Sequence, residues 1–328
     1  MRFLFRMFFW CLLLAVVAGG YVYYRLSEPY AGFSESVFVD FAHGTGTSEI
    51  ADILAQKGVV EQRWMFLAAR LFRGGILQAG EYKFDKPATP LEVYSKIARG
   101  DIFYLELLLP EGFNMFDMAP AVAKLGTIKA ADFLAAARKP GLIRDLDPRA
   151  ASLEGYLFPS KYRIYRRTTA EQLCRLMTDE FRRQWKNLNT HEDVHDIVTL
   201  ASLVEREARL PEDRPNVASV FANRLRLGVK LDCDPTTVYA ALLENRYRGA
   251  IHRSDLDNPS PWNTYRHAGL PPGPIANPGL SSIKAALRPA ETNYLYFVAK
   301  ADGSGGHTFS ETLAQHEAAV ASYRASGR

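Results

Sequence analysis

The longest uninterrupted apolar stretch lies near the N-terminus. Residues 7–24 carry no charge, and Arg2 and Arg6 precede them. As a helix at about 1.5 Å per residue, these eighteen residues extend about 27 Å, close to the hydrocarbon thickness of a bilayer. A cleaved signal peptide is the alternative, but its apolar core is usually shorter and an Ala-x-Ala site follows it. The pattern therefore favours a retained transmembrane anchor, with residues 1–6 as a cytoplasmic tail and the chain after Arg25 outside.

Beyond this stretch the apolar positions alternate between strand and helix periods. A mixed α+β fold is the expected class. Strands are predicted at residues 37–41, 105–109 and 294–299, and helices at residues 47–58, 193–208, 217–227 and 311–323 and after Pro235. Residues 258–278 are rich in Pro, Asn and Gly, and they are predicted to form a loop.

The order of strand, glycine turn and helix recurs along the chain. Gly44 and Gly58 are each followed 68 residues later by another glycine, Gly112 and Gly126. The segment at residues 80–84 is similar to the segment at residues 155–158, which also begins with glycine. This recurrence predicts two related strand–helix modules.

Composition narrows the function classes only a little. Hydrophobic residues make up 48% of the 328 residues and the formal net charge is +4, so a large core is expected and nucleic-acid binding is not indicated. Cys11 lies in the apolar stretch, which leaves Cys174 and Cys233 as the one possible pair. An extracytoplasmic location permits that disulfide without requiring it, and two free thiols are equally compatible.

A short motif of the zinc-protease type occurs at residues 191–195. His191 and His195 lie four residues apart with Glu192 between them, as in helices that hold a catalytic zinc ion. Thr190 and Asp193 are predicted to form a capping box, which would make this segment the polar, solvated first turn of a helix. The motif is therefore expected not to bind metal.

Two glutamates near the end of the same helix are candidates for acid–base chemistry. Glu205 borders an apolar face, where a partly desolvated carboxyl can serve as a general acid. A glutamate in a Glu-Arg-Glu run is more often on a solvated helix face, and periodicity does not choose between Glu205 and Glu207.

Two later segments suit carbohydrate binding. Asp234 and Pro235 are typical of a helix start. Residues 261–275 combine a rigid proline-rich loop with Asn263 and Tyr265, and clustered polar groups and an aromatic face suit a sugar. A rigid structural turn would explain the prolines equally well.

Taken together and in order, these segments resemble the YceG-like family of endolytic murein transglycosylases. The resemblance covers nearly the whole chain. It is carried by the N-terminal anchor and by residues 77–82, 153–159, 200–207, 220–225, 234–236, 263–265, 269–274, 294–298 and 306–310. The chain departs from the family pattern at Cys233 and Thr237 and at Ser160-Lys161.

The resemblance implies a single-pass inner-membrane protein with a periplasmic catalytic domain. Residues 37–100 would form a LysM-like module and residues 104–325 the transglycosylase domain. The reaction would cleave the β-1,4 bond between N-acetylmuramic acid and N-acetylglucosamine, leaving a 1,6-anhydro end. Its expected partners are peptidoglycan strands and the synthases that polymerise them, the penicillin-binding proteins. No cofactor and no metal are expected.

The resemblance also implies that Glu205 is the acid/base. Residue type and motif position suggest Asn223, Asp234, Thr236, Asn263 and Tyr265 as glycan-binding residues. One carboxyl suffices because the sugar's own 6-hydroxyl, tethered to the reacting carbon, acts as the nucleophile. The rival functions are a non-catalytic glycan-binding scaffold of the cell-wall machinery and a zinc protease.

Overall fold

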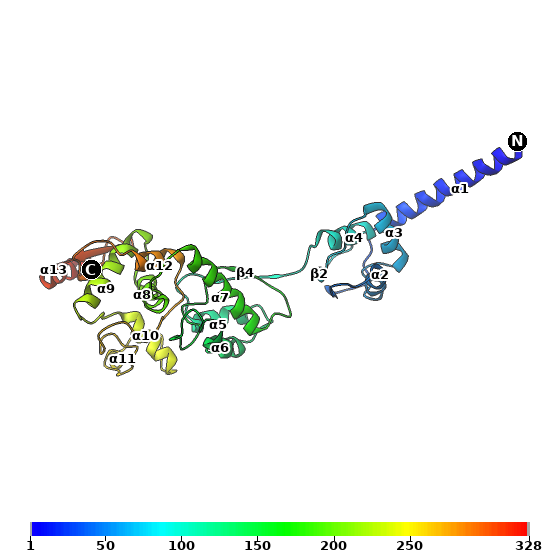
Figure 1. Cartoon of the computed structure of the whole chain (residues 1–328). Coiled ribbons are helices and arrows are strands. Elements are labelled where there is room, and N and C mark those ends of the chain that lie inside the picture. Colours follow the sequence, from blue (N-terminus) through cyan, green and yellow to red (C-terminus); the bar gives the residue numbers. More distant parts are fainter. Residues whose placement is uncertain (1, 327–328) are drawn as a thin grey trace. The chain divides into compact units, whose positions relative to one another are not determined.

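The chain folds into two compact units, described here from a computed structural model that covers residues 2–326 (Figure 1). The first unit ends at Tyr104 and the second begins at Leu105. The protein has the mixed α+β character that the sequence predicts.

The first unit is built on a long N-terminal helix and a two-stranded sheet. Strand β1 pairs with β2 in antiparallel register, and the helices α1, α3 and α4 pack on one another. Thr89 and Glu92 form a capping box at the start of α4, and Gly100 ends it in the left-handed conformation. The elements are α1 (Arg2–Ser27), β1 (Val37–Phe41), α2 (Thr47–Gln56), α3 (Arg63–Arg73), β2 (Gly80–Phe84) and α4 (Pro90–Arg99).

The helix α1 contains the predicted apolar span. It is long and apolar enough to cross a membrane, and the eighteen-residue window that meets this criterion is not buried inside the protein. Residue 1 of the predicted tail lies outside the described residues. Leu26, near the end of α1, is fully buried against the first unit.

The second unit is mainly helical, with two small antiparallel sheets. Its elements are β3 (Leu105–Leu108), α5 (Met115–Ala123), α6 (Ala130–Ala137), η1 (Pro140–Leu142), β4 (Lys161–Ile164), α7 (Ala170–Asn187), α8 (Val194–Glu207), η2 (Pro211–Asp213), α9 (Arg214–Arg226), α10 (Asp234–Leu243), α11 (Arg253–Leu256), α12 (Leu280–Leu287), β5 (Tyr296–Ala299), β6 (His307–Ser310) and α13 (Leu313–Ser326).

The centre of the second unit is α8. Every residue from Val198 to Val204 is buried, and α8 packs against α9, α10 and α12. A helix that is apolar nearly all round belongs in a core rather than at a surface. The residues that leave this core lie at the two ends of the helix, and its last turn contains Glu205 and Glu207.

The predicted recurrence corresponds to a shared order of elements. Each unit contains a strand, two helices after it and a returning antiparallel strand, from β1 to β2 in the first unit and from β3 to β4 in the second. The segment that begins at Gly155 does not form the strand that corresponds to β2. Residues 155–158 form a turn, and β4 starts at Lys161.

Gly155 holds that turn against the core. Its φ is +87°, and a Cβ atom at this position would collide with Pro274 and with Val198 of α8. The left-handed conformation and the close packing both exclude a side chain. Gly155 thus keeps the loop around Pro274 close to the central helix.

We expect Gly155→Ala to destabilise the protein by about 2–3 kcal/mol, because the added methyl group meets a strained backbone and a filled core. Chemical denaturation measures the change. Gly141→Ala is the matched control, since Gly141 has open space around it and no positive φ. Equal stability of the two variants would contradict this account of the turn.

Candidate active site

Glu205 lies at the end of the central helix and is sheltered from solvent. Its side chain is 5% exposed. One carboxylate oxygen accepts a hydrogen bond from the Arg214 guanidinium at 3.0 Å, and the other accepts from the Gly279 backbone N–H at 3.0 Å. Gly279 precedes α12, so the donor is a free N–H at a helix start. Both oxygens are therefore fixed by groups from other elements.

Arg214 faces a second carboxyl group as well. It is the first residue of α9, and its side chain is 10% exposed. Besides Glu205, the guanidinium lies 3.6 Å from the Glu111 carboxylate and contacts the Ser281 hydroxyl. Burial, together with the charge of Glu205, raises the pKa of Glu111. One cation thus serves two carboxyl groups, and their mutual repulsion favours keeping a proton in the cluster.

Two loops that carry parts of this cluster are joined by backbone hydrogen bonds. The Gly112 N–H donates to Asn277 O at 3.0 Å, and the Asn277 N–H donates to Phe113 O at 3.0 Å. Arg206, next to Glu205, donates to Gly112 O at 3.0 Å. The turn that holds Glu111 and the segment that leads to Gly279 therefore move together.

A buried carboxyl group, that of Glu154, completes this connection. It accepts hydrogen bonds from the Met115 N–H at 3.0 Å and from the Asn277 side-chain amide at 2.7 Å. The Asn277 side-chain oxygen in turn accepts from the Leu157 N–H. Burial raises the pKa of Glu154 to about 8 and outweighs these hydrogen bonds and that of Tyr239. A largely neutral Glu154 thus anchors Asn277 at neutral pH.

Glu207 lies elsewhere, two residues along α8 and so on the other side of the helix. Its carboxylate accepts from the Cys233 thiol at 3.2 Å, and burial raises its pKa. Glu207 therefore does not lie on a solvated helix face, which is the commoner position for a glutamate in a Glu-Arg-Glu run. It lines a pocket of about 380 Å³, which is within the size range of ligand sites. The pocket is lined by Glu207, Phe221, Arg224, Leu231, Asp232, Cys233, Asp234, Tyr265, Tyr296, Phe297, Leu313 and His316.

Two of the five predicted glycan-binding residues line that pocket. Tyr265 donates its hydroxyl to the Asp234 carboxylate at 2.6 Å. Asp234 is the first residue of α10 rather than its cap, which is Cys233. These two side chains present a ring and a carboxylate beside Glu207.

The other three predicted residues are engaged within the fold. Asn223 donates to two backbone carbonyls just before β5, and Thr236 bonds to Cys233 O and to Thr264. Asn263 is fully buried, and its amide donates to the carbonyls of Asp255, Leu256 and Asn258. Their hydrogen bonds hold loops and strands in place.

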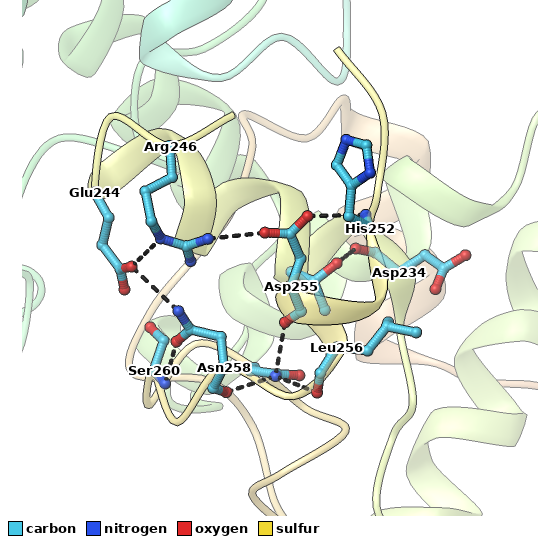
Figure 2. Close-up of polar contacts among 10 residues, drawn as sticks. Asp234, Glu244, Arg246, His252, Asp255, Leu256, Asn258 and Ser260 are labelled. Atoms are coloured by element: carbon cyan, nitrogen blue, oxygen red, sulfur yellow. Dashed lines mark hydrogen bonds and ion pairs between the residues drawn. The ribbon is translucent and has the colours of Figure 1, made fainter. Parts of the chain in front are cut away.

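The loop around Asp255 shows the same structural use of polar side chains (Figure 2). Arg246 forms ion pairs with Glu244 at 2.6 Å and with Asp255 at 2.8 Å, while Asp255 accepts from the His252 N–H. Asn258 accepts from the Ser260 N–H. This network orders the chain between α10 and the loop that contains Tyr265.

The zinc-type motif has a different geometry from the one predicted. Asp193 itself caps α8, so His191 and Glu192 precede the helix. His195 is buried rather than solvated, and its ring nitrogens bond to Asp147 at 2.7 Å and to Pro272 O at 3.0 Å. Within residues 2–326 there is no cluster of three or more side chains suited to hold a metal ion. Cys174 and Cys233 are both buried and unpaired.

Comparison with known proteins shows the family of this chain. Residues 39–322 match the YceG-like family. The chain belongs to the YceG-like family. An endolytic murein transglycosylase of Bacillus subtilis is 32% identical and aligns over 94% of this chain and 91% of its own. A Streptococcus pneumoniae protein of the same name is 29% identical over 86% of this chain and 58% of its own. The crystal structure of a YceG-like protein from Listeria monocytogenes is 31% identical and has a TM-score of 0.56 over 87% of this chain and 99% of that one.

Sequence reasoning missed several groups around Glu205 in this YceG-like protein. Glu111 directly precedes Gly112 and carries no signal of its own in the sequence, and Arg214 lies before the helix predicted at residues 217–227. Glu154 was noted only as part of a motif. Pro215 was the available signal, because proline favours the first turn of a helix and would have started α9 earlier.

We expect the stability of the wild type to fall as pH rises from about 4.5 to about 8, relative to Glu154→Gln. The folded state keeps the Glu154 proton over this window, whereas the unfolded chain with its ordinary pKa releases it. The stabilisation is therefore complete below about pH 4.5 and lost as pH passes 8. Unfolding free energies of both proteins across this window measure the difference. Parallel pH profiles would contradict a protonated Glu154.

Proposed function

We propose that this protein is an endolytic murein lytic transglycosylase with Glu205 as its acid/base. It would cleave the β-1,4 bond between N-acetylmuramic acid and N-acetylglucosamine inside nascent glycan strands and so end their growth. The proposal rests on the family membership and above all on the sheltered carboxyl of Glu205, which two donors hold at the end of a rigid helix.

The reaction needs one group that first gives and then takes a proton. Glu205 donates a proton to the glycosidic oxygen, and the bond from that oxygen to C1 of the muramic acid breaks. The 6-hydroxyl oxygen of the same sugar bonds to C1, and its proton passes to Glu205. The product is a 1,6-anhydro end, no water is consumed, and Glu205 is again protonated.

The surroundings of Glu205 suit both halves of this cycle. Arg214 and the Gly279 N–H stabilise the carboxylate that exists after the first proton transfer. Glu111 shares the same guanidinium, and its raised pKa favours retention of a proton beside Glu205. The low exposure of Glu205 limits competition from water.

The rest of the chain would serve to place this site at the cell wall. In this proposal α1 spans the inner membrane with residues 1–6 in the cytoplasm, and the chain after Arg25 lies in the periplasm. Residues 37–100 would act as a LysM-like module and residues 104–325 as the catalytic domain. Penicillin-binding synthases would supply the nascent strands. The pocket beside Glu207, which Asp234 and Tyr265 also line, would bind a part of the glycan strand that is distant from the bond to be cleaved.

We expect Glu205→Gln to lower the release of anhydro-muropeptides from purified murein at least about a hundredfold, because the amide cannot donate and recover the proton. Mass analysis of the digest measures the products. Glu207→Gln is the comparison variant: it changes a carboxyl two residues away that lines the proposed glycan pocket and takes no part in the proposed proton transfer, and it keeps an acceptor for Cys233. Loss of activity in Glu207→Gln alone would transfer the role to Glu207. Wild-type release by both variants would assign the acid/base to another residue, and no release by the wild type itself would favour a non-catalytic scaffold.

We expect neither a chelator nor His191→Ala to change the release of anhydro-muropeptides. The His195 ring is hydrogen-bonded to Asp147 and to Pro272 O, and His191 precedes α8, so the two histidines do not form a metal site on one helix face. The digest is repeated with and without a chelator. Loss of activity that added zinc restores would refute the transglycosylase mechanism.

A further inference from the structure

The surface next to the base of α1 carries an unusual exposed apolar segment. All six residues from Leu71 to Ile76, at the end of α3 and in the turn that follows, are exposed. Leu71 is 87% exposed and Ile76 is 81% exposed, which is more than any large apolar side chain of α1 itself. A soluble surface rarely presents such groups together without a partner.

The segment is fixed to the end of the apolar span. The Phe72 ring lies 6.3 Å from the ring of Tyr23, and α1 packs against α3 and α4. Tyr23 is one residue before the end of the uncharged stretch. Arg25 is the first residue after this stretch, and it forms an ion pair with Glu61. Because this uncharged stretch extends about 27 Å and a hydrocarbon core about 30 Å, Tyr23 falls at the membrane boundary when α1 spans it. Phe72 then lies at the same level.

The charges around the segment suit the same surroundings. Arg70 and Arg73 lie in the last turn of α3, and both are exposed. Aromatic and basic side chains beside exposed aliphatic ones are typical of segments that sit in the headgroup layer of a bilayer with anionic lipids. A folded partner protein would need a complementary surface, whereas the lipid is brought to this segment by α1 itself.

We propose that residues 71–76 insert into the lipid headgroup layer and hold the first unit against the membrane surface. The inference rests on the proposed membrane span of α1. The segment would then be a second membrane contact beside α1, formed by the folded unit. It would restrict how far the first unit can tilt or rise above the bilayer.

The test uses the full-length protein in nanodiscs of phosphatidylcholine and phosphatidylglycerol that contain nitroxide-labelled lipids. Cys11 is the one exposed cysteine among the described residues, so a fluorophore on the wild type reports a position inside the apolar span, in the N-terminal half of α1. In a Cys11→Ser background, Ile76→Cys reports the apolar segment. Lys83→Cys is the control, because its neighbours Tyr82 and Phe84 face the core and Lys83 faces the other side of the sheet.

We expect a nitroxide near the headgroup to quench the label at residue 76 at least about twofold more than the label at residue 83. Equal quenching at residues 76 and 83, with Cys11 quenched by a nitroxide deep in the chains, would overturn the insertion while leaving the anchor intact. Absence of deep quenching at Cys11 would instead refute the membrane span, and the inference with it. Protection of residue 76 only at high protein density would assign the segment to a second copy and overturn the lipid contact.

Discussion

The arrangement of the second unit depends on one buried guanidinium between two carboxyl groups. Arg214 begins α9, Glu205 ends α8 and Glu111 belongs to the turn after β3, so a single side chain ties three distant parts of the chain together. A buried charge is tolerated only where partners compensate it. Removal of Arg214 would leave both carboxyl groups without their cation, so this side chain holds the three elements at one point.

The second constraint is the pair of loops that close over this cluster. Asn277 bonds through its backbone to residues 112 and 113 and through its side chain to Glu154 and Leu157. A buried amide with all its hydrogen bonds made specifies one arrangement, because any shift leaves a polar group without a partner. Because Gly279 follows Asn277 by two residues, its N–H is held in position as a donor to Glu205. Geometry at the site is therefore set by residues that do not touch it.

Local sequence patterns predict much of the fold but only part of the candidate site. The strand at residues 37–41 and the central helix followed from periodicity, and the helix α1 followed from its uninterrupted apolar run; both signals are local properties. Arg214 and Glu111 could not be paired in this way, since their contact depends on how α9 and the β3 turn pack in three dimensions. Asn223, Thr236 and Asn263 looked like ligand-binding residues because polar groups in a motif do not reveal whether they point into the fold or out of it. Burial decides that, and burial is set by the whole chain.

The helix period explains why one short run of sequence contains two different carboxyl sites. Residues two apart on a helix point in nearly opposite directions, so Glu205 and Glu207 cannot enter the same cavity. Glu205 enters a closed cluster with a guanidinium and a backbone N–H, where a proton can be given and recovered. Glu207 enters a pocket that Cys233 and Asp234 also line, and burial raises its pKa. Arg224 lines the same pocket, but no ion pair joins it to Glu207 among the described residues. A Val-Glu-x-Glu run at the end of a buried helix can thus supply a reacting group on one side and a ligand-facing wall on the other.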